Sequence, residues 1–355
     1  MSDVDNPTDT ENPTPHDELA YAAQLVALGL SSEALSLLDR LAEHDPSQPQ
    51  VYVLRAQATQ QAGGVLAAWV DVRAALALGR RLGIDLHPLQ ALSDRLRQEL
   101  SDEIPLLAVA RAMTILRRLI FVEKPRAAEE LAESLLPHLG AYRPLLLLAT
   151  GLSKLSRGRV EQAIADFESS VELLPSLWPA AYACGEALLQ VHDREGAARA
   201  FAHTVEQRRM SSAGFVLSEA EELLSSLPGL SFVAHRFAFD YAGLLHSLDR
   251  SADAVTVLEG LIAEEPDAAD AHLSKAVILA KRGQLDDALS SLRLAESSLR
   301  PDDRRLESDD PLERILRLQV DVLTALGRGE EAEALRQAMP AKLTEGQQAP
   351  STDVP

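Results

Sequence analysis

The residues of this chain that most often do chemistry in proteins are its single cysteine and its nine histidines. Cys184 stands beside Gly185 in a stretch of small and apolar residues, which favours a buried structural thiol over a nucleophile. The histidines are scattered, and neither an H-E-x-x-H pair nor a cysteine–histidine set with zinc spacing is present. Phosphate-binding glycine loops and the G-x-S-x-G turn of hydrolases are missing too. We therefore expect no catalytic residue, no metal and no cofactor, and predict that the chain is not an enzyme.

The most marked group of basic side chains lies in the first half of the sequence and comprises Arg111, Arg117, Arg118, Lys124 and Arg126. One interpretation is a site for an anion or an acidic peptide. The other is a solvated helix face whose arginines pair with nearby glutamates. We favour the second, because most surface charges have no specific role.

The overall charge limits the classes of partner. With 34 basic and 54 acidic residues the net charge is −20, which argues against a nucleic-acid surface and against docking on anionic lipid. The N-terminus lacks the pattern of a secretory signal, no apolar run is long enough to span a membrane, and one cysteine cannot form an internal disulfide. We expect a cytoplasmic protein that does not insert into membranes. The excess of arginine over lysine, with abundant alanine and leucine, is typical of bacteria with GC-rich genomes.

A 34-residue period indicates the elements that would position any binding residues. Three kinds of residue recur at this offset in the centre of the chain: Gly151 and Gly185, Ala163 and Ala197, Phe167 and Phe201. Pro175 follows the first copy, where a proline would end a helix. Strand patterns are missing, so the sequence predicts an all-α fold.

This spacing of small, aromatic and proline residues resembles the tetratricopeptide repeat, whose period is about 34 residues. The resemblance implies a right-handed superhelical solenoid of antiparallel helix hairpins, as one array or split into two arms. It also implies that Gly151 faces Ala163 inside a hairpin, and that Phe167 fills the space between neighbouring hairpins. Gly158 should adopt a left-handed backbone conformation at the turn between the two helices.

Breaks in the period divide the chain into eight segments. We expect a disordered acidic tail (1–14), an N-terminal repeat pair (15–82), an irregular helical segment with a degenerate repeat (83–143), a central repeat pair (144–211), an insertion (212–234), a C-terminal repeat pair (235–302), a capping helical hairpin (303–340) and a disordered tail (341–355). The charged last hairpin suits a cap, because the end of a solenoid needs a polar outer face.

The resemblance also implies a binding groove, since the first helix of each hairpin lines the concave side of such arrays. Projecting that face gives the candidate partner-binding residues Gln57, Gln60, Arg117, Leu148, Leu152, Leu155, Tyr182, Glu186, Phe239 and His246. The central leucines suit an amphipathic helix or an extended segment, but they would equally suit packing between helices. The Lys, Asn and Arg clamp that binds chaperone C-termini is missing, because Leu19, Ala23 and Leu54 stand at its places.

Three classes of function follow from these patterns. The leading hypothesis is a non-enzymatic scaffold or adaptor that binds a peptide or helix of one or more proteins. The alternative is a chaperone-like or regulatory protein that sequesters one client polypeptide, for example of a secretion, motility or signalling system. The third is an enzyme with an unrecognised site in residues 83–143, which no residue pattern supports. Protein segments are the expected partners, and we expect neither nucleic acid nor a small-molecule ligand.

Overall fold

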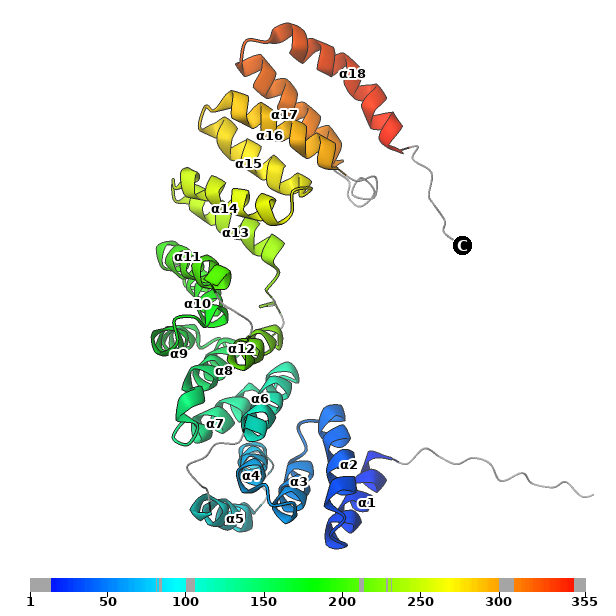
Figure 1. Ribbon diagram of the computed structural model, residues 1–355, viewed down its shortest axis with the longest axis vertical. Helices are drawn as coiled ribbons and strands as arrows, with labels where there is room; N and C mark the ends of the chain where they lie inside the picture. The colour runs from blue at the N-terminus through cyan, green and yellow to red at the C-terminus, as the bar shows by residue number, and fades with distance from the viewer. Residues whose placement is uncertain are drawn as a thin grey trace, which may run out of the picture. The chain divides into compact units, whose positions relative to one another are not determined.

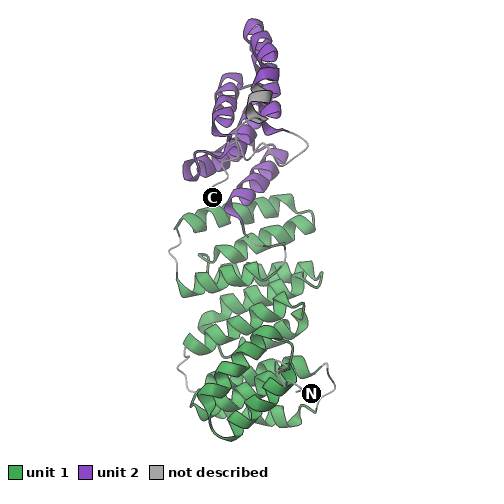
Figure 2. Ribbon diagram, turned by 90° about the vertical axis from the view of Figure 1, so that its right-hand side faces the viewer, with its two compact units in different colours: residues 1–232 green, residues 233–355 purple. Residues whose placement is uncertain are grey.

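The computed structural model describes residues 14–80, 82, 85–99, 106–210, 214–227, 229–230, 232–299 and 310–347. All regular secondary structure in these residues is helical, which confirms the all-α prediction. The chain divides into two compact units, residues 1–232 (unit 1) and residues 233–355 (unit 2), which Figure 2 colours separately. Each unit is a stack of antiparallel helix hairpins.

The described part of unit 1 contains five hairpins and two additional helices (Figure 1). The hairpins are α1 (Pro15–Ala27) with α2 (Ser31–His44), α3 (Pro49–Gln61) with α4 (Val65–Gly79), α6 (Leu106–Phe121) with α7 (Pro125–Leu135), α8 (Arg143–Leu155) with α9 (Val160–Leu173), and α10 (Trp178–Gln190) with α11 (Arg194–Met210). The additional helices are α5 (His87–Gln98), which packs on α4, and α12 (Phe215–Ser225). A short 3-10 helix, Gly140–Tyr142, leads into α8.

Unit 2 contains three hairpins within its described residues: α13 (Ala234–Ser247) with α14 (Ser251–Glu264), α15 (Ala269–Lys281) with α16 (Leu285–Ser298), and α17 (Pro311–Ala325) with α18 (Gly329–Gln347). The sequence predicted a disordered tail from residue 341, but α18 continues through Pro340 to Gln347. The residues that follow Pro340 include Ala341, Lys342 and Leu343, which favour helix. Residues 1–13 and 348–355 of the predicted tails lie outside the described residues.

Each hairpin in the described residues turns through one residue with a positive φ. Glycine holds this place in five hairpins, at Gly29, Gly63, Gly158, Gly283 and Gly327. The φ of Gly158 is 72°, so its predicted left-handed conformation is confirmed. In the other three hairpins the place is held by Glu123, His192 and Asp249, with φ between 59° and 63°. Because the connection requires this conformation, the turn forms even where the sequence has no glycine.

In both central hairpins a phenylalanine ring lies directly against the backbone of a glycine. A Cβ placed on Gly151 would lie 2.7 Å from Cδ1 of Phe167, and one on Gly185 would lie 2.5 Å from Cδ1 of Phe201. Both rings are almost fully buried. The ring of Phe167 therefore lies on Gly151 within its own hairpin. The expectation that Phe167 also fills the space between neighbouring hairpins stays a prediction. Only glycine fits at position 151, because the ring of Phe167 occupies the space that a side chain would need.

Neighbouring hairpins also contact one another through their first helices. The first helices α1 and α3, α6 and α8, α8 and α10, and α13 and α15 lie in contact, whereas the second and third hairpins meet through their second helices, α4 and α7. These pairs of first helices lie next to one another within each unit. We call the surface that these helices form the first-helix face of each unit.

The glycine–phenylalanine contact predicts a steric penalty that helix propensity alone would not. Gly151→Ala should destabilise unit 1 by about 1–3 kcal/mol, because the new methyl group overlaps the ring of Phe167. Trp69 and Trp178 both belong to unit 1, so tryptophan fluorescence during urea unfolding isolates this transition. Adding Phe167→Leu should recover part of the loss. A Gly151→Ala variant as stable as the parent would contradict the contact.

The turn residues predict opposite effects at two equivalent places. His192→Gly should stabilise unit 1 by roughly 0.5–1 kcal/mol, because glycine adopts the positive φ without the steric cost of a Cβ. Gly158→Val should destabilise it by about 1–2 kcal/mol for the converse reason. Urea unfolding detected by tryptophan fluorescence measures both variants. A loss of stability in His192→Gly would contradict the prediction, because the imidazole of His192 would then stabilise the fold by more than its positive φ destabilises it.

Candidate protein-interaction surface

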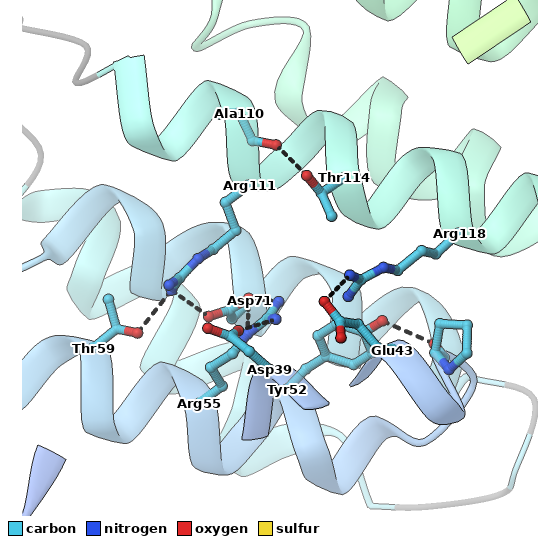
Figure 3. Close-up of polar contacts among 11 residues, drawn as sticks. Asp39, Glu43, Tyr52, Arg55, Thr59, Asp71, Ala110, Arg111, Thr114 and Arg118 are labelled. Carbon is cyan, nitrogen blue, oxygen red and sulfur yellow. Dashed lines mark hydrogen bonds and ion pairs between the residues drawn. The ribbon is translucent and has the colours of Figure 1, made fainter. Parts of the chain in front are cut away.

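A buried ion network fixes the first three hairpins of unit 1 to one another (Figure 3). At its centre lies the fully buried carboxylate of Asp71 on α4. Arg55 of α3 donates to its Oδ1 from Nε at 3.1 Å and Nη2 at 2.6 Å, and Arg111 of α6 donates to Oδ2 at 3.0 Å. Arg55 also donates to Asp39 of α2 at 2.9 Å, and Arg111 to Thr59 of α3 at 2.8 Å. The network thus joins four helices.

The charges of this network attract one another, but burial opposes them. Burial raises the pKa of Asp71, and the charges of Arg55 and Arg111 offset only part of this effect. Burial alone would lower the pKa of Arg55, but the charge and hydrogen bond of Asp71, and then the charge of Asp39, raise it above its usual value. Tyr52 lies beside the network, with the Arg55 guanidinium 5.1 Å from its ring centre, and donates its hydroxyl to the carbonyl of Pro46 at 2.9 Å. Burial raises the pKa of Tyr52 to about 12. These groups bind one another, so the network positions helices.

The structure separates the basic residues that the sequence groups together. Arg111 joins the buried network, Arg118 donates to Glu43 of α2 at 2.8 Å, and Arg117 forms an ion pair with Glu222 of α12. Lys124 and Arg126 are exposed at the start of the second helix of the hairpin. Arg117 and Arg118 pair with glutamates, as the favoured interpretation expects, whereas Arg111 departs from it, because its partner is the buried aspartate Asp71. Their partners come from other helices, far away in the sequence.

The predicted groove residues of the first-helix faces differ in accessibility. Gln57 of α3 is exposed and Gln60 is half-buried, and on α13 of unit 2 Phe239 and His246 are half-buried. The leucines of α8 are buried: Leu148 and Leu152 are fully inaccessible, and Leu155 is 7% exposed. A partner could contact Gln57 and Gln60 directly, whereas it could reach the leucines only after rearrangement of the side chains that cover them.

The remaining predicted residues of unit 1 lie near a segment of the chain itself. Helix α12 lies against α6, α8 and α10, which are first helices of three successive hairpins (Figure 1). Arg117 of α6 pairs with Glu222 of α12. The ring of Tyr182 on α10 lies 5.1 Å from that of Phe232, which follows α12, and Glu186 is half-buried one turn further along α10. The first-helix face of unit 1 therefore already holds a helix.

The sequence could not place this helix. Its pattern indicates a short helix near residues 218–226 within an insertion, and the structure has one at Phe215–Ser225. Two glutamates, Glu219 and Glu222, and the later Phe232 are the residues that sequence reasoning missed. A signal existed in the three-residue spacing of the glutamates beside Leu223 and Leu224, which makes one face acidic and one apolar.

The potentially reactive groups of this chain are its single cysteine and the residue types that bind metals. Cys184 is buried, and burial raises the pKa of its thiol to about 12, with a smaller contribution from the charge of Glu168. Among the described residues, no group of three or more His, Cys, Asp or Glu side chains could hold a metal ion. In the same residues, the helices are all too short or too polar to cross a membrane.

The hairpins agree with a known repeat family. Residues 245–304, which include α14, α15 and α16, match the family model of the tetratricopeptide repeat. This chain contains tetratricopeptide repeats. Unit 1 has the same hairpins, in which the turn residues Gly158 and His192 lie 34 residues apart, as Asp249 and Gly283 do in unit 2.

Several solved structures of tetratricopeptide repeat proteins are similar to the chain. MamA shares 15% identity at a TM-score of 0.38, over 51% of this chain and 92% of that one. The C-terminal part of a repeat protein from Cytophaga hutchinsonii shares 11% identity at 0.46, over 93% and 100%. YrrB, described as a tetratricopeptide repeat protein with an unusual peptide-binding site, shares 16% identity at 0.30, over 56% and 89%. A search of curated proteins found no significant match.

The buried network predicts a large loss of stability when its centre is removed. Asp71→Ala should destabilise unit 1 by about 3–5 kcal/mol, because it leaves the buried Arg55 and the adjacent Arg111 without their shared carboxylate. Glu43→Ala, which removes a 61% exposed partner of Arg118, is the matched control and should cost no more than about 1 kcal/mol. Urea unfolding detected by tryptophan fluorescence measures both, and equal effects would contradict a central role for Asp71.

Proposed function

We propose that this protein is a non-enzymatic scaffold whose first-helix faces bind helical segments of other proteins. Tetratricopeptide repeats form protein-interaction modules in general, and the buried network of unit 1 supplies a rigid frame for such a surface. The observation that carries the proposal is the position of α12, since a helix docked across α6, α8 and α10 supports binding of amphipathic helices on this face.

The same reasoning extends to unit 2. The side of α13 that includes Phe239, Gly243 and His246 remains accessible, with Gly243 exposed and the other two side chains half-buried. An aromatic ring beside an exposed glycine leaves room for a partner helix to approach closely. On α3 of unit 1, Gln57 and Gln60 extend the accessible surface with uncharged polar groups. We propose the side chains of Phe239, His246, Gln57 and Gln60 as the first contacts for a partner.

The composition supports the rest of the proposal. With a net charge of −20 the chain does not suit nucleic acid, and the partners we propose are proteins only. One buried cysteine and an acidic exterior fit a cytoplasmic protein, which is the location we propose.

A substitution at Gly243 tests the first-helix face without disturbing the core. No atom lies within 4 Å of a Cβ placed on Gly243, so Gly243→Arg should fold normally and even gain up to about 1 kcal/mol of helix stability. The large charged side chain should lower partner recovery at least about tenfold, the change that a loss of 1.4 kcal/mol produces. Affinity purification from the source cell, quantified by mass spectrometry against the parent chain, measures this recovery.

Ser290→Arg provides the control, because Ser290 is exposed on α16, a second helix of the same unit. Recovery should be unchanged in this variant. Equal recovery in Gly243→Arg and Ser290→Arg would contradict binding on the first-helix face of unit 2. The stoichiometry of the recovered complex separates a scaffold, which holds several components, from a protein that sequesters a single client.

A further inference from the structure

Residues 214–227, 229–230 and 232, which we call the strap, follow the last hairpin of unit 1, and the helix α12 within them lies on the first-helix face of that unit. The chain leaves α11 at Met210 and places α12 against α6, α8 and α10, instead of adding another hairpin to the stack. The hairpins beneath it contact one another directly, through α7 with α8 and α9 with α10. The strap therefore covers the face without being needed to connect the hairpins.

The apolar side of the strap is that of a helix bound in a groove. Ala220, Leu223 and Leu224 are buried, while Glu221 and Ser225 are exposed on the opposite side. Buried residues at i, i+3 and i+4 are the anchors by which amphipathic helices bind apolar grooves. At the start of α12, the ring of Phe215 packs edge-on against that of Tyr142, with 6.2 Å between ring centres.

The charged side of the strap meets a basic residue of the face. Arg117 of α6 pairs with Glu222 and lies 4.0 Å from Glu219. The side chain of Glu222 is 54% exposed, so water screens this pair. Burial raises the pKa of Glu219, and the charge of Arg117 offsets only part of this effect. The charge of Arg117 therefore favours an acidic helix on this face, but the ion pair itself contributes little to the affinity.

The end of the strap contributes an aromatic anchor. Phe232 lies 4.7 Å from the ring of Trp178 and 5.1 Å from that of Tyr182, both on α10, and the guanidinium of Arg208 lies over it at 5.3 Å. Leu230 is buried just before it. An aromatic ring held by two rings and a guanidinium is a specific feature, which a competing segment would have to reproduce.

The start of the strap fits the face incompletely. A cleft of about 530 Å³ remains where the first turn of α12 meets the ends of other helices, lined mainly by apolar side chains that include Leu106, Leu174, Met210 and Val216. Leu106 is 51% exposed and Met210 is 76% exposed. With 11 residues, α12 is also shorter than the length at which isolated helices become stable, so its helical state depends on docking.

We infer that the strap is a built-in occupant of the first-helix face of unit 1, and that an acidic amphipathic helix of a partner protein displaces it. Such a helix carries two carboxylates three residues apart, two leucines directly after the second carboxylate, and an aromatic residue beyond its C-terminus. This inference rests on the proposed function, because it assigns to one face of the scaffold the chemical class of its partner and a reason why binding there is regulated.

A synthetic peptide with the sequence of residues 214–232, labelled with fluorescein, tests the inference on the full chain. Leu223→Asp combined with Leu224→Asp releases the strap and leaves every hairpin residue unchanged. The peptide should bind this variant at least about tenfold more tightly than the parent chain, because the parent's own strap competes for the face. Fluorescence anisotropy measures the two dissociation constants. Glu221→Lys, at an exposed strap position, is the control and should bind like the parent.

The charge of the face provides a second measurement. In the released variant, Arg117→Glu should weaken binding of this peptide, and a peptide with lysine at both Glu219 and Glu222 should recover it. Equal affinities for the parent and the released variant, or no binding to the folded released variant, would overturn the inference. Loss of the cooperative unfolding transition in the released variant would overturn it too, since α12 would then be part of the permanent core. The assay needs no natural partner, so its result is independent of partner recovery in Gly243→Arg.

Discussion

The requirement that one helix hairpin cannot cover its own apolar surface governs this structure. In the central hairpins, Phe167 and Phe201 lie directly on the backbone of Gly151 and Gly185, which brings the two helices of each hairpin close together. The remaining apolar surface is then covered only by the next hairpin. The buried ion network and the helix α12 both occupy positions that this stacking creates.

Stacking also explains where charges are buried. Asp71 lies on α4, between the hairpin that precedes it and the one that follows, and it binds arginines from both α3 and α6. A fully buried carboxylate is unfavourable alone, but here it holds two guanidinium groups whose own neighbours are fixed. The network therefore specifies how three hairpins meet, across the place where the 34-residue period of the sequence breaks and α5 is inserted.

The functional picture combines an open face with an occupied one. The first helix of unit 2 presents Phe239, Gly243 and His246, whereas in unit 1 the residues Arg117 and Tyr182 are engaged by the chain itself. Stacked hairpins produce both faces by the same geometry. The two faces differ because the strap lies on that of unit 1. The strap is shorter than 20 residues and is not part of a repeat, and its polarity matches the surface on which it lies.

The sequence by itself determined the local features: helical periodicity, the small residues at helix crossings, the turn at Gly158 and the 34-residue period. These depend on contacts within one hairpin or between adjacent ones, so the pattern carries them. Only the tertiary structure decided that Phe167 packs on Gly151, that His192 takes the left-handed turn, and that Arg117 pairs with Glu222. It also decided that α12 lies on three first helices. Such long-range contacts depend on which surfaces the assembled stack leaves open, and no local spacing of residues encodes that.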